Sequence, residues 1–217
     1  MELVIGLIVL IYSAILHEIA HGYVADRFGD PTARLMGRLT LNPLPHIDPW
    51  MSIALPLLLL LSGSPIIFGG AKPVPIDPYN FHEGRKDIAL VALAGPLTNV
   101  LLAIAGSLLL HGLRAITPYL PQDMYLTIIV NIVYIILSTI AFYNILLAIF
   151  NLLPIPPLDG SKIFALLLPD DLANAYLSLS SIGIFILFFL LLFPIGGFSL
   201  SAFIASLFGF AKNLLGI

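Results

Sequence analysis

The chain of 217 residues contains no cysteine and few charged side chains. Without cysteine it can form no disulfide and has no thiolate for catalysis or metal binding. Only 10% of its residues are charged, and a formal net charge of −3 argues against a nucleic-acid partner. By contrast, 59% are hydrophobic and the mean hydropathy is +1.06, well above that of soluble domains. The composition therefore predicts a protein embedded in a lipid bilayer.

Long uncharged stretches predict where the chain crosses the membrane. A spanning helix needs about 20 mostly apolar residues. The stretches that approach this length are 3–16 continuing toward 25, 88–110, 126–150 and 172–211. The last one divides at PIGG (194–197), which gives about five transmembrane helices. The predicted fold is an all-α polytopic membrane protein, and no repeat or linker divides 1–217 into more than one domain.

Three shorter segments are predicted to lie between the spans. Residues 51–62 hold too few apolar residues to cross, and both flanks are basic, so we predict a re-entrant or short helix there. Such a segment should pack over a wet cavity. Residues 33–41 alternate weakly, and two prolines keep 71–77 extended. These two pieces predict a small membrane-associated β-sheet.

The few basic residues predict the orientation of the chain. Arg27, Arg34 and Arg38 follow the first span, Lys72, Arg85 and Lys86 precede 88–110, and Lys162 follows 126–150. The positive-inside rule therefore places 26–87 and 153–173 in the cytoplasm and the 111–124 loop outside.

The first apolar stretch contains the motif HEIAH at 17–21. On a helix, His17 and His21 share one face, one turn apart, which is the H-E-x-x-H arrangement that binds zinc through two imidazoles. Glu18 would be the general base, taking a proton from water and passing it to the departing amine. The alternative is a metal-free His–Glu cluster. Because a central charge in a membrane helix costs about 2.5–3.5 kcal/mol, such a cluster needs a compensating partner, and we favour a metal.

A catalytic zinc has three protein ligands and an open position, so the motif requires a third ligand. Asp159 lies near the end of NLLPIPPLDG (151–160), where three prolines should unwind the chain at membrane depth. Such irregular backbone needs a pocket. Asp159 could also be the N-cap of a following helix. His46 and Asp48 form a competing pair, although in a proline-rich loop they more often support a turn.

Polar and small residues also occur inside the later spans. Asn99 needs a partner in lipid, and a helix–helix hydrogen bond is the preferred interpretation over a role in binding substrate. Asn144 is interpreted as a packing contact of the same kind. Gly95 and Pro96 predict a kink or a site of close helix packing.

In combination, these motifs resemble the site-2 proteases, the intramembrane zinc metalloproteases. The resemblance covers about residues 10–165 and rests on HEIAH, on AGPLTN (94–99) and on NLLPIPPLDG. NPLPHIDP (42–49) and FGGAKPVP (68–75) resemble the prokaryotic branch. The chain lacks the PDZ insertion and CBS domains of many relatives, so the resemblance is to the minimal members of that branch.

The resemblance implies a role for each matching residue. It implies one zinc per chain, held by His17, His21 and Asp159, with Glu18 as the base. It also implies that Asn151 helps to hold the substrate or the developing oxyanion.

The resemblance also implies a setting for the chain. Residues 1–217 would form a single transmembrane protease domain, with a catalytic core at about 10–165 and accessory helices at 172–217. The chain would be a multi-pass protein of the cytoplasmic (inner) membrane, with its active site toward the cytoplasm.

The implied activity is hydrolysis of peptide bonds in or beside transmembrane segments of other proteins, as in regulated intramembrane proteolysis. The substrate helix must unwind first, and 33–41 and 71–77 could capture the unwound strand by β-augmentation. The expected partners are such membrane proteins and the bilayer itself; no oligomeric state is indicated.

Two other functions compete with proteolysis. A membrane metal-ion transporter or binding protein could also place His and Glu one turn apart, but a transporter needs ligands along a path. The helices at 88–110, 126–150 and 175–193 contain no His, Asp or Glu. An inactive protein that only retains membrane partners would be expected to have lost Glu18. A metalloprotease with a downstream Glu as third ligand is disfavoured because only Glu83 follows the motif.

Overall fold

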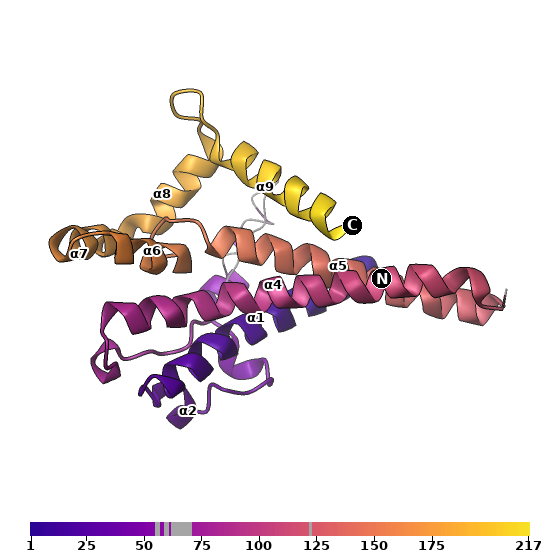
Figure 1. Cartoon of the computed structure of the whole chain (residues 1–217), viewed down its shortest axis with the longest axis horizontal. Helices are drawn as coiled ribbons and strands as arrows, with labels where there is room; N and C mark the ends of the chain where they lie inside the picture. The colour runs from indigo at the N-terminus through magenta and orange to yellow at the C-terminus, as the bar shows by residue number, and fades with distance from the viewer. Residues whose placement is uncertain (55–56, 59–60, 62–70, 122) are drawn as a thin grey trace.

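Three long helices form the centre of the molecule, and the motif lies on the first of them. The computed structural model describes residues 1–54, 57–58, 61, 71–121 and 123–217. Helices α1 (Glu2–Arg27), α4 (Arg85–Ile116) and α5 (Met124–Asn151) pack against one another in every pairwise combination. They run alongside each other in Figure 1. The spans predicted at 3–25, 88–110 and 126–150 are confirmed as these three helices.

Among the residues that the structure describes, three helices are long and apolar enough to cross a membrane, or four if one bent pair counts as a single span. The three long helices each qualify, α4 together with the η4 turn (Thr117–Tyr119). Helices α7 (Asp170–Ser178) and α8 (Ser180–Leu192) qualify only as a pair, bent by 69° where they meet. The fifth predicted span corresponds to α9 (Leu200–Leu215), an apolar helix that is shorter than a spanning helix.

Short elements connect the long helices. They are α2 (Thr32–Leu35), η1 (Leu44–His46), η2 (Pro49–Ala54), η3 (Pro78–Asn80), α6 (Asp159–Phe164) and η5 (Ala165–Leu167). The short helix predicted at 51–62 lies partly outside the described residues. Of the described part, 51–54 belong to η2, a turn of π-helix, and 57, 58 and 61 are helical.

The predicted β-sheet is wrong for the residues that the structure describes. Residues 33–41 begin inside α2, and 71–77 contains no strand. Pro73 and Pro75 have no N–H to donate to a neighbouring strand. The N–H groups of Lys72 and Val74 donate elsewhere, to the carbonyl of His46 and the carboxylate of Glu18.

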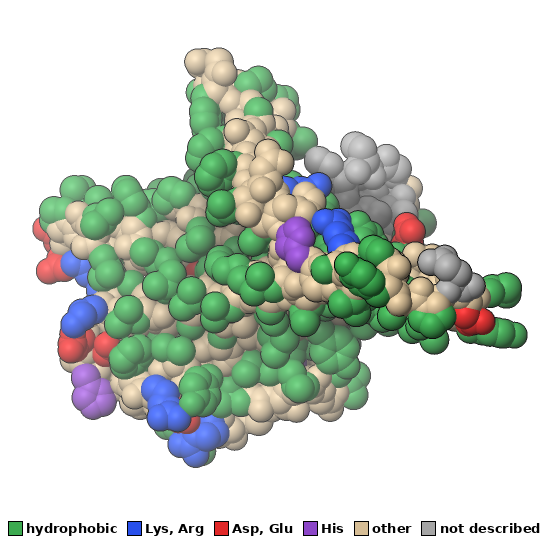
Figure 2. Space-filling view, turned by 45° about the vertical axis from the view of Figure 1, so that its right-hand side comes forward, with side chains coloured by type: hydrophobic (Ala, Val, Ile, Leu, Met, Phe, Trp, Pro, Cys, Tyr) green, Lys and Arg blue, Asp and Glu red, His purple; other side chains and the backbone are tan. Residues whose placement is uncertain are grey.

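Small side chains fill the contacts between the long helices, whereas large apolar side chains face outward. Ala25, Ala92, Ala103, Ala141 and Ala148 are among the buried residues. A Cβ atom on Gly106 of α4 would lie 3.3 Å from the backbone oxygen of Leu137 on α5. Membrane helices associate through such small residues because lipid gives no hydrophobic driving force between them. Figure 2 shows hydrophobic side chains over most of the visible face, with charged ones in a few small groups.

Candidate metal centre

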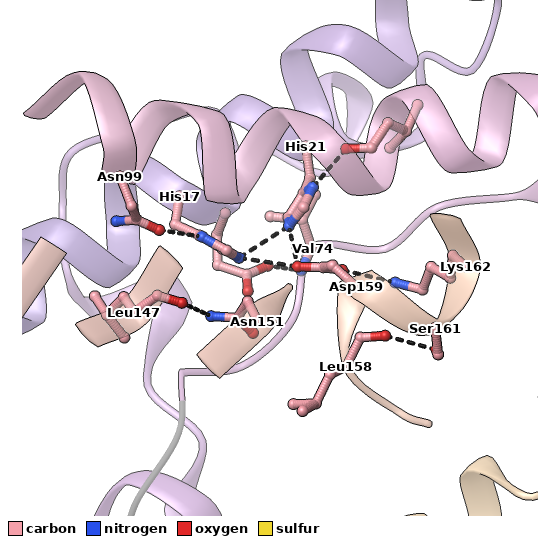
Figure 3. A network of polar contacts seen from close by, with 12 residues as sticks. His17, His21, Val74, Asn99, Leu147, Asn151, Leu158, Asp159, Ser161 and Lys162 are labelled. Carbon is pink, nitrogen blue, oxygen red and sulfur yellow. Dashed lines mark hydrogen bonds and ion pairs between the residues drawn. The ribbon is translucent and has the colours of Figure 1, made fainter. Parts of the chain in front are cut away.

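His17, His21 and Asp159 meet at one buried point between α1, α4 and the start of α6 (Figure 3). Nε2 of His17 lies 3.2 Å from Oδ2 of Asp159, and Nε2 of His21 lies 3.1 Å from the same oxygen. The two Nε2 atoms are 3.0 Å apart. All three side chains are less than 10% exposed. Two imidazoles and a carboxylate therefore present three ligand atoms to one small volume.

The second nitrogen of each imidazole is held by α4. Nδ1 of His21 lies 2.7 Å from the carbonyl oxygen of Val91, which can only accept a hydrogen bond. Nδ1 of His17 lies 2.6 Å from Oδ1 of Asn99. When both Nδ1 atoms donate, the neutral rings keep their lone pairs on Nε2, facing Asp159. Metal-bound histidines usually have such a partner on the other nitrogen.

Gly95 allows α4 to approach the imidazoles. It lies midway between Val91 and Asn99, so the three residues follow one face of the helix at intervals of four. A Cβ atom at Gly95 would lie 2.6 Å from Nε2 of His17 and would also collide with His21. The interpretation of Gly95 as a site of close packing is confirmed.

Asp159 reaches the centre because the chain leaves helical geometry after α5. Residues 152–158 form turns and bends, as the three prolines predict. Leu153 anchors this stretch in a cluster with Leu187 and Leu200. Gly160 fits only without a side chain, since a Cβ atom would collide with the carbonyl of Leu152. Asp159 is the first residue of α6 and Leu158 is its N-cap, so the N-cap alternative for Asp159 is wrong.

The carboxylate of Asp159 is stabilised in its charged form. Burial disfavours this charge, but the positive charge of Lys162 offsets the cost. Lys162 lies one turn along α6, with Nζ 3.0 Å from Oδ1 of Asp159. The two carboxylate oxygens thus face different partners: Oδ2 faces the imidazoles, and Oδ1 faces the lysine.

Glu18 lines a cavity of about 410 Å³, and His17, His21 and Asp159 line the same cavity. The far wall is formed by residues 71–80, which we call the covering segment. The N–H of Val74 in this segment donates to Oε2 of Glu18 at 2.7 Å. Asn151 and Lys162 line the same cavity. A carboxylate, two imidazoles and a second carboxylate therefore share a space large enough for a segment of peptide.

The remaining candidate residues have other partners. Nδ2 of Asn151 donates to the carbonyl of Leu147 at 3.0 Å, within its own helix. Nε2 of His46 lies 2.9 Å from the carbonyl oxygen of Thr40, and Oδ1 of Asp48 accepts from the N–H of Trp50. His46 and Asp48 thus support a turn, as expected, and the metal-like cluster found among the described residues does not include them.

Sequence reasoning missed three contacts of this site. Asn99 was interpreted as a helix–helix contact, and it does donate to Asn144 at 2.7 Å, but it also holds His17. Its position in a membrane helix was a signal that it had important partners. The contact of His21 with Val91 could not have been predicted, because it uses a backbone carbonyl and every residue has one. Lys162 could have been found from its position three residues after Asp159 on a helix.

The comparisons with known proteins agree with this geometry. The model of "Peptidase family M50" matches residues 5–194. The "Putative zinc metalloprotease YwhC" of Bacillus subtilis is 36% identical over 199 residues, 89% of this chain and 82% of that protein. The "Putative zinc metalloprotease Rip2" of Mycolicibacterium smegmatis is 36% identical over 148 residues, 68% of this chain and 51% of that protein. No solved structure matches the chain significantly.

The family match covers nearly all of the three long helices and every residue of the cluster. The expected relationship to the site-2 proteases and the expected metalloendopeptidase class are therefore confirmed. The names of the relatives imply zinc as the metal. The chain belongs to peptidase family M50 and is a multi-pass membrane metalloprotease.

Proposed function

We propose that the chain binds one zinc ion through His17, His21 and Asp159 and cleaves peptide bonds in or beside transmembrane segments of other proteins. The observation that carries the proposal is the convergence of three ligand atoms within 4.8 Å of one another. Two imidazoles and one carboxylate are a ligand set of catalytic zinc sites, which leave a fourth position open. The hydrogen bonds on both Nδ1 atoms fit this set, since they leave Nε2 free for the metal.

Zinc, when bound, supplies Lewis-acid polarisation of a carbonyl and activation of water. Glu18 is the proposed general base, because its carboxylate faces the same cavity as the three ligands. It takes a proton from water and passes it to the departing amine. Asn151 lines the cavity on the side of α5, where its amide can contact the substrate backbone.

We further propose the setting that the sequence predicts. The chain lies in the cytoplasmic membrane with its cavity toward the cytoplasm, where the basic residues of 26–87 would be retained. The catalytic core is about 10–165, and 172–217 provides accessory helices. The substrates are membrane proteins whose helices unwind before cleavage, as in regulated intramembrane proteolysis. Capture of the unwound strand by β-augmentation is not part of this proposal, because neither 33–41 nor 71–77 is a strand.

The test is metal analysis of the purified chain together with Glu18→Gln, assayed on a panel of single-span membrane proteins. We expect the wild-type chain to contain one zinc and to cleave at least one substrate. Glu18→Gln should retain zinc and lose cleavage by about 10²–10⁴-fold, the usual contribution of a general base. Glu83→Gln is the matched control, because Glu83 is exposed and lies outside the cavity. A chain without zinc, or Glu18→Gln with full activity, would contradict the proposal; metal transport by Glu18→Gln would favour a carrier.

A further inference from the structure

A row of buried amide side chains extends from His17 across the bundle. Oδ1 of Asn99 faces Nδ1 of His17 at 2.6 Å, and Nδ2 of Asn99 donates to Oδ1 of Asn144 at 2.7 Å. Nδ2 of Asn144 donates to the carbonyl of Ile140 at 2.9 Å and to Oγ of Ser13 at 2.8 Å. Asn99 and Asn144 are fully buried. The row joins α4 to α5 and returns to α1, four residues before His17.

The orientation of each amide in this row is set at the end farthest from His17, by the carbonyl of Ile140. The carbonyl of Ile140 can only accept a hydrogen bond, so the group of Asn144 that faces it must be the NH₂. The oxygen of Asn144 then faces Asn99 and requires the NH₂ of Asn99. This leaves the oxygen of Asn99 facing His17, so Nδ1 of His17 must be the protonated nitrogen. Each step follows from the donor and acceptor inventory of the side chains.

The two imidazoles therefore differ in the kind of partner that fixes their tautomer. His21 faces a backbone carbonyl, which can only accept a hydrogen bond. His17 faces a primary amide, which could present either its oxygen or its NH₂ after a flip. A flipped Asn99 would donate to Nδ1 of His17 and move the ring proton to Nε2, toward Asp159. That tautomer has no lone pair on Nε2 for a metal.

We propose that Asn144 is a positioning residue that acts through Asn99 to keep the Nε2 lone pair of His17 available for the metal. This inference rests on the proposed zinc site. Asn144 touches neither the metal ligands nor the cavity; it fixes which way the amide of Asn99 points. Ser13 is a second acceptor for Asn144, but it is not needed to orient the amide of Asn144, because the carbonyl of Ile140 already does so.

The first part of the test compares zinc affinities of purified variants by chelator competition. Asn144→Leu keeps the volume but removes the acceptor for Asn99, and its zinc affinity should fall by about 10–100-fold, as for other losses around metal-bound histidines. Ser13→Ala should change the affinity less than about threefold, because the bond from Asn144 to Ile140 remains. Asn131→Leu removes an exposed amide from the same helix and is the matched control, with no expected change.

The second part uses rescue by Asn99→Asp, which distinguishes the relay from a purely structural contact. A carboxylate accepts with either oxygen, so it holds Nδ1–H of His17 without help from Asn144. Asn144→Leu should therefore cost less than about threefold in zinc affinity when Asn99→Asp is also present. A structural role would make the double variant worse, because both sides of the Asn99–Asn144 bond are then lost.

The outcomes separate the inference from the proposed function. Unchanged zinc affinity in Asn144→Leu, or a double variant weaker than Asn144→Leu, would overturn the inference while the zinc site stands. A wild-type chain that binds no zinc would overturn both. If Asn144→Leu does not fold, Asn144→Ala replaces it, since it also removes the acceptor for Asn99 and should show the same loss of zinc affinity. Unchanged zinc affinity in Asn144→Ala would also overturn the inference.

Discussion

The two sides of the cavity are both held by hydrogen bonds, but the bonds are of different kinds. On the helical side, most of the bonds around His17 join side chains of α1, α4 and α5. On the other side, most of the bonds to the covering segment join side chains to backbone atoms. Asp30 accepts the N–H of Asp77, Arg38 donates to the carbonyls of Lys72 and Pro73, and Glu18 accepts the N–H of Val74.

The difference follows from whether the backbone N–H and C=O groups of each region are already hydrogen-bonded within a helix. A long helix satisfies its own backbone groups, so its side chains are free to orient other side chains. The covering segment has no such regular pattern, and its backbone groups need partners from elsewhere. The helical side therefore sets the positions of the ligands, whereas the other side sets the position of the segment that lies over Glu18.

Gly95→Ala should have the largest effect and should act on the helical side alone. The added methyl would collide with both imidazoles, and overpacking of this kind costs about 1–3 kcal/mol. Zinc affinity should therefore fall by about tenfold to a hundredfold, at about 1.4 kcal/mol per factor of ten. Gly112→Ala is the control on the same helix, since its Cβ would meet nothing within 4 Å. Equal zinc affinities in the two variants would show that α4 does not position the imidazoles.

Val74→Pro should act on the opposite side and spare the metal. Proline removes the N–H that donates to Glu18, so the carboxylate loses its fixed position. Cleavage should fall by about 10–100-fold, the range that a displacement near 1 Å can cause. Zinc content should not change, because Val74 does not contact the ligands. Val74→Ala trims the side chain but keeps the N–H, and we expect it to lose far less activity; equal losses would contradict a role for this hydrogen bond.

The two sides also differ in how well the sequence predicts them. The helical side follows from apolar length, from the spacing of His17 and His21, and from the prolines before Asp159. These signals are local, and a membrane helix has few alternatives once its length is set. The row from His17 to Asn144 could not be derived, because it depends on how three helices rotate against one another.

The covering segment was predicted less well. Pro73 and Pro75 did indicate the absence of helix in 71–77, but extended character was taken as evidence for a sheet. A sheet needs backbone partners, and the sequence does not show that Glu18 and His46 are the acceptors of the two N–H groups. Helix α2 was missed because a four-residue helix at 32–35 has too short a pattern to detect.

Asp30→Asn should destabilise the covering segment without weakening zinc binding on the helical side. Asp30 is fully buried and accepts hydrogen bonds from Thr32, Asp77 and Asn80. Its replacement leaves an NH₂ group facing donors, which should cost about 1.5–3 kcal/mol. Thermal unfolding in detergent and limited proteolysis at 71–80 should detect the loss, while zinc affinity should stay within about threefold of wild type. Asp26→Asn, which breaks an ion pair with the exposed Arg34, is the control and should cost less than about 1 kcal/mol. A large loss of zinc affinity in Asp30→Asn would show that the two sides are not independent.

The smallest expected effect is the dependence of the covering segment on pH. Burial acts to raise the pKa of Asp30, but hydrogen bonds from Thr32, Asn80 and the backbone of Asp77 and Thr32 hold it below its ordinary value of 3.8. A carboxyl group whose pKa is lowered on folding contributes stability that is fully present above its unfolded pKa and is lost as the pH falls through its folded pKa. The difference in stability between the wild-type chain and Asp30→Asn should therefore be constant from neutral pH down to about pH 5 and shrink below pH 3.8. Proteolysis at 71–80, measured with an acid-active protease, reports this difference directly. A difference that already shrinks between pH 7 and 5 would mean that another group, and not Asp30, controls how tightly the segment lies over Glu18.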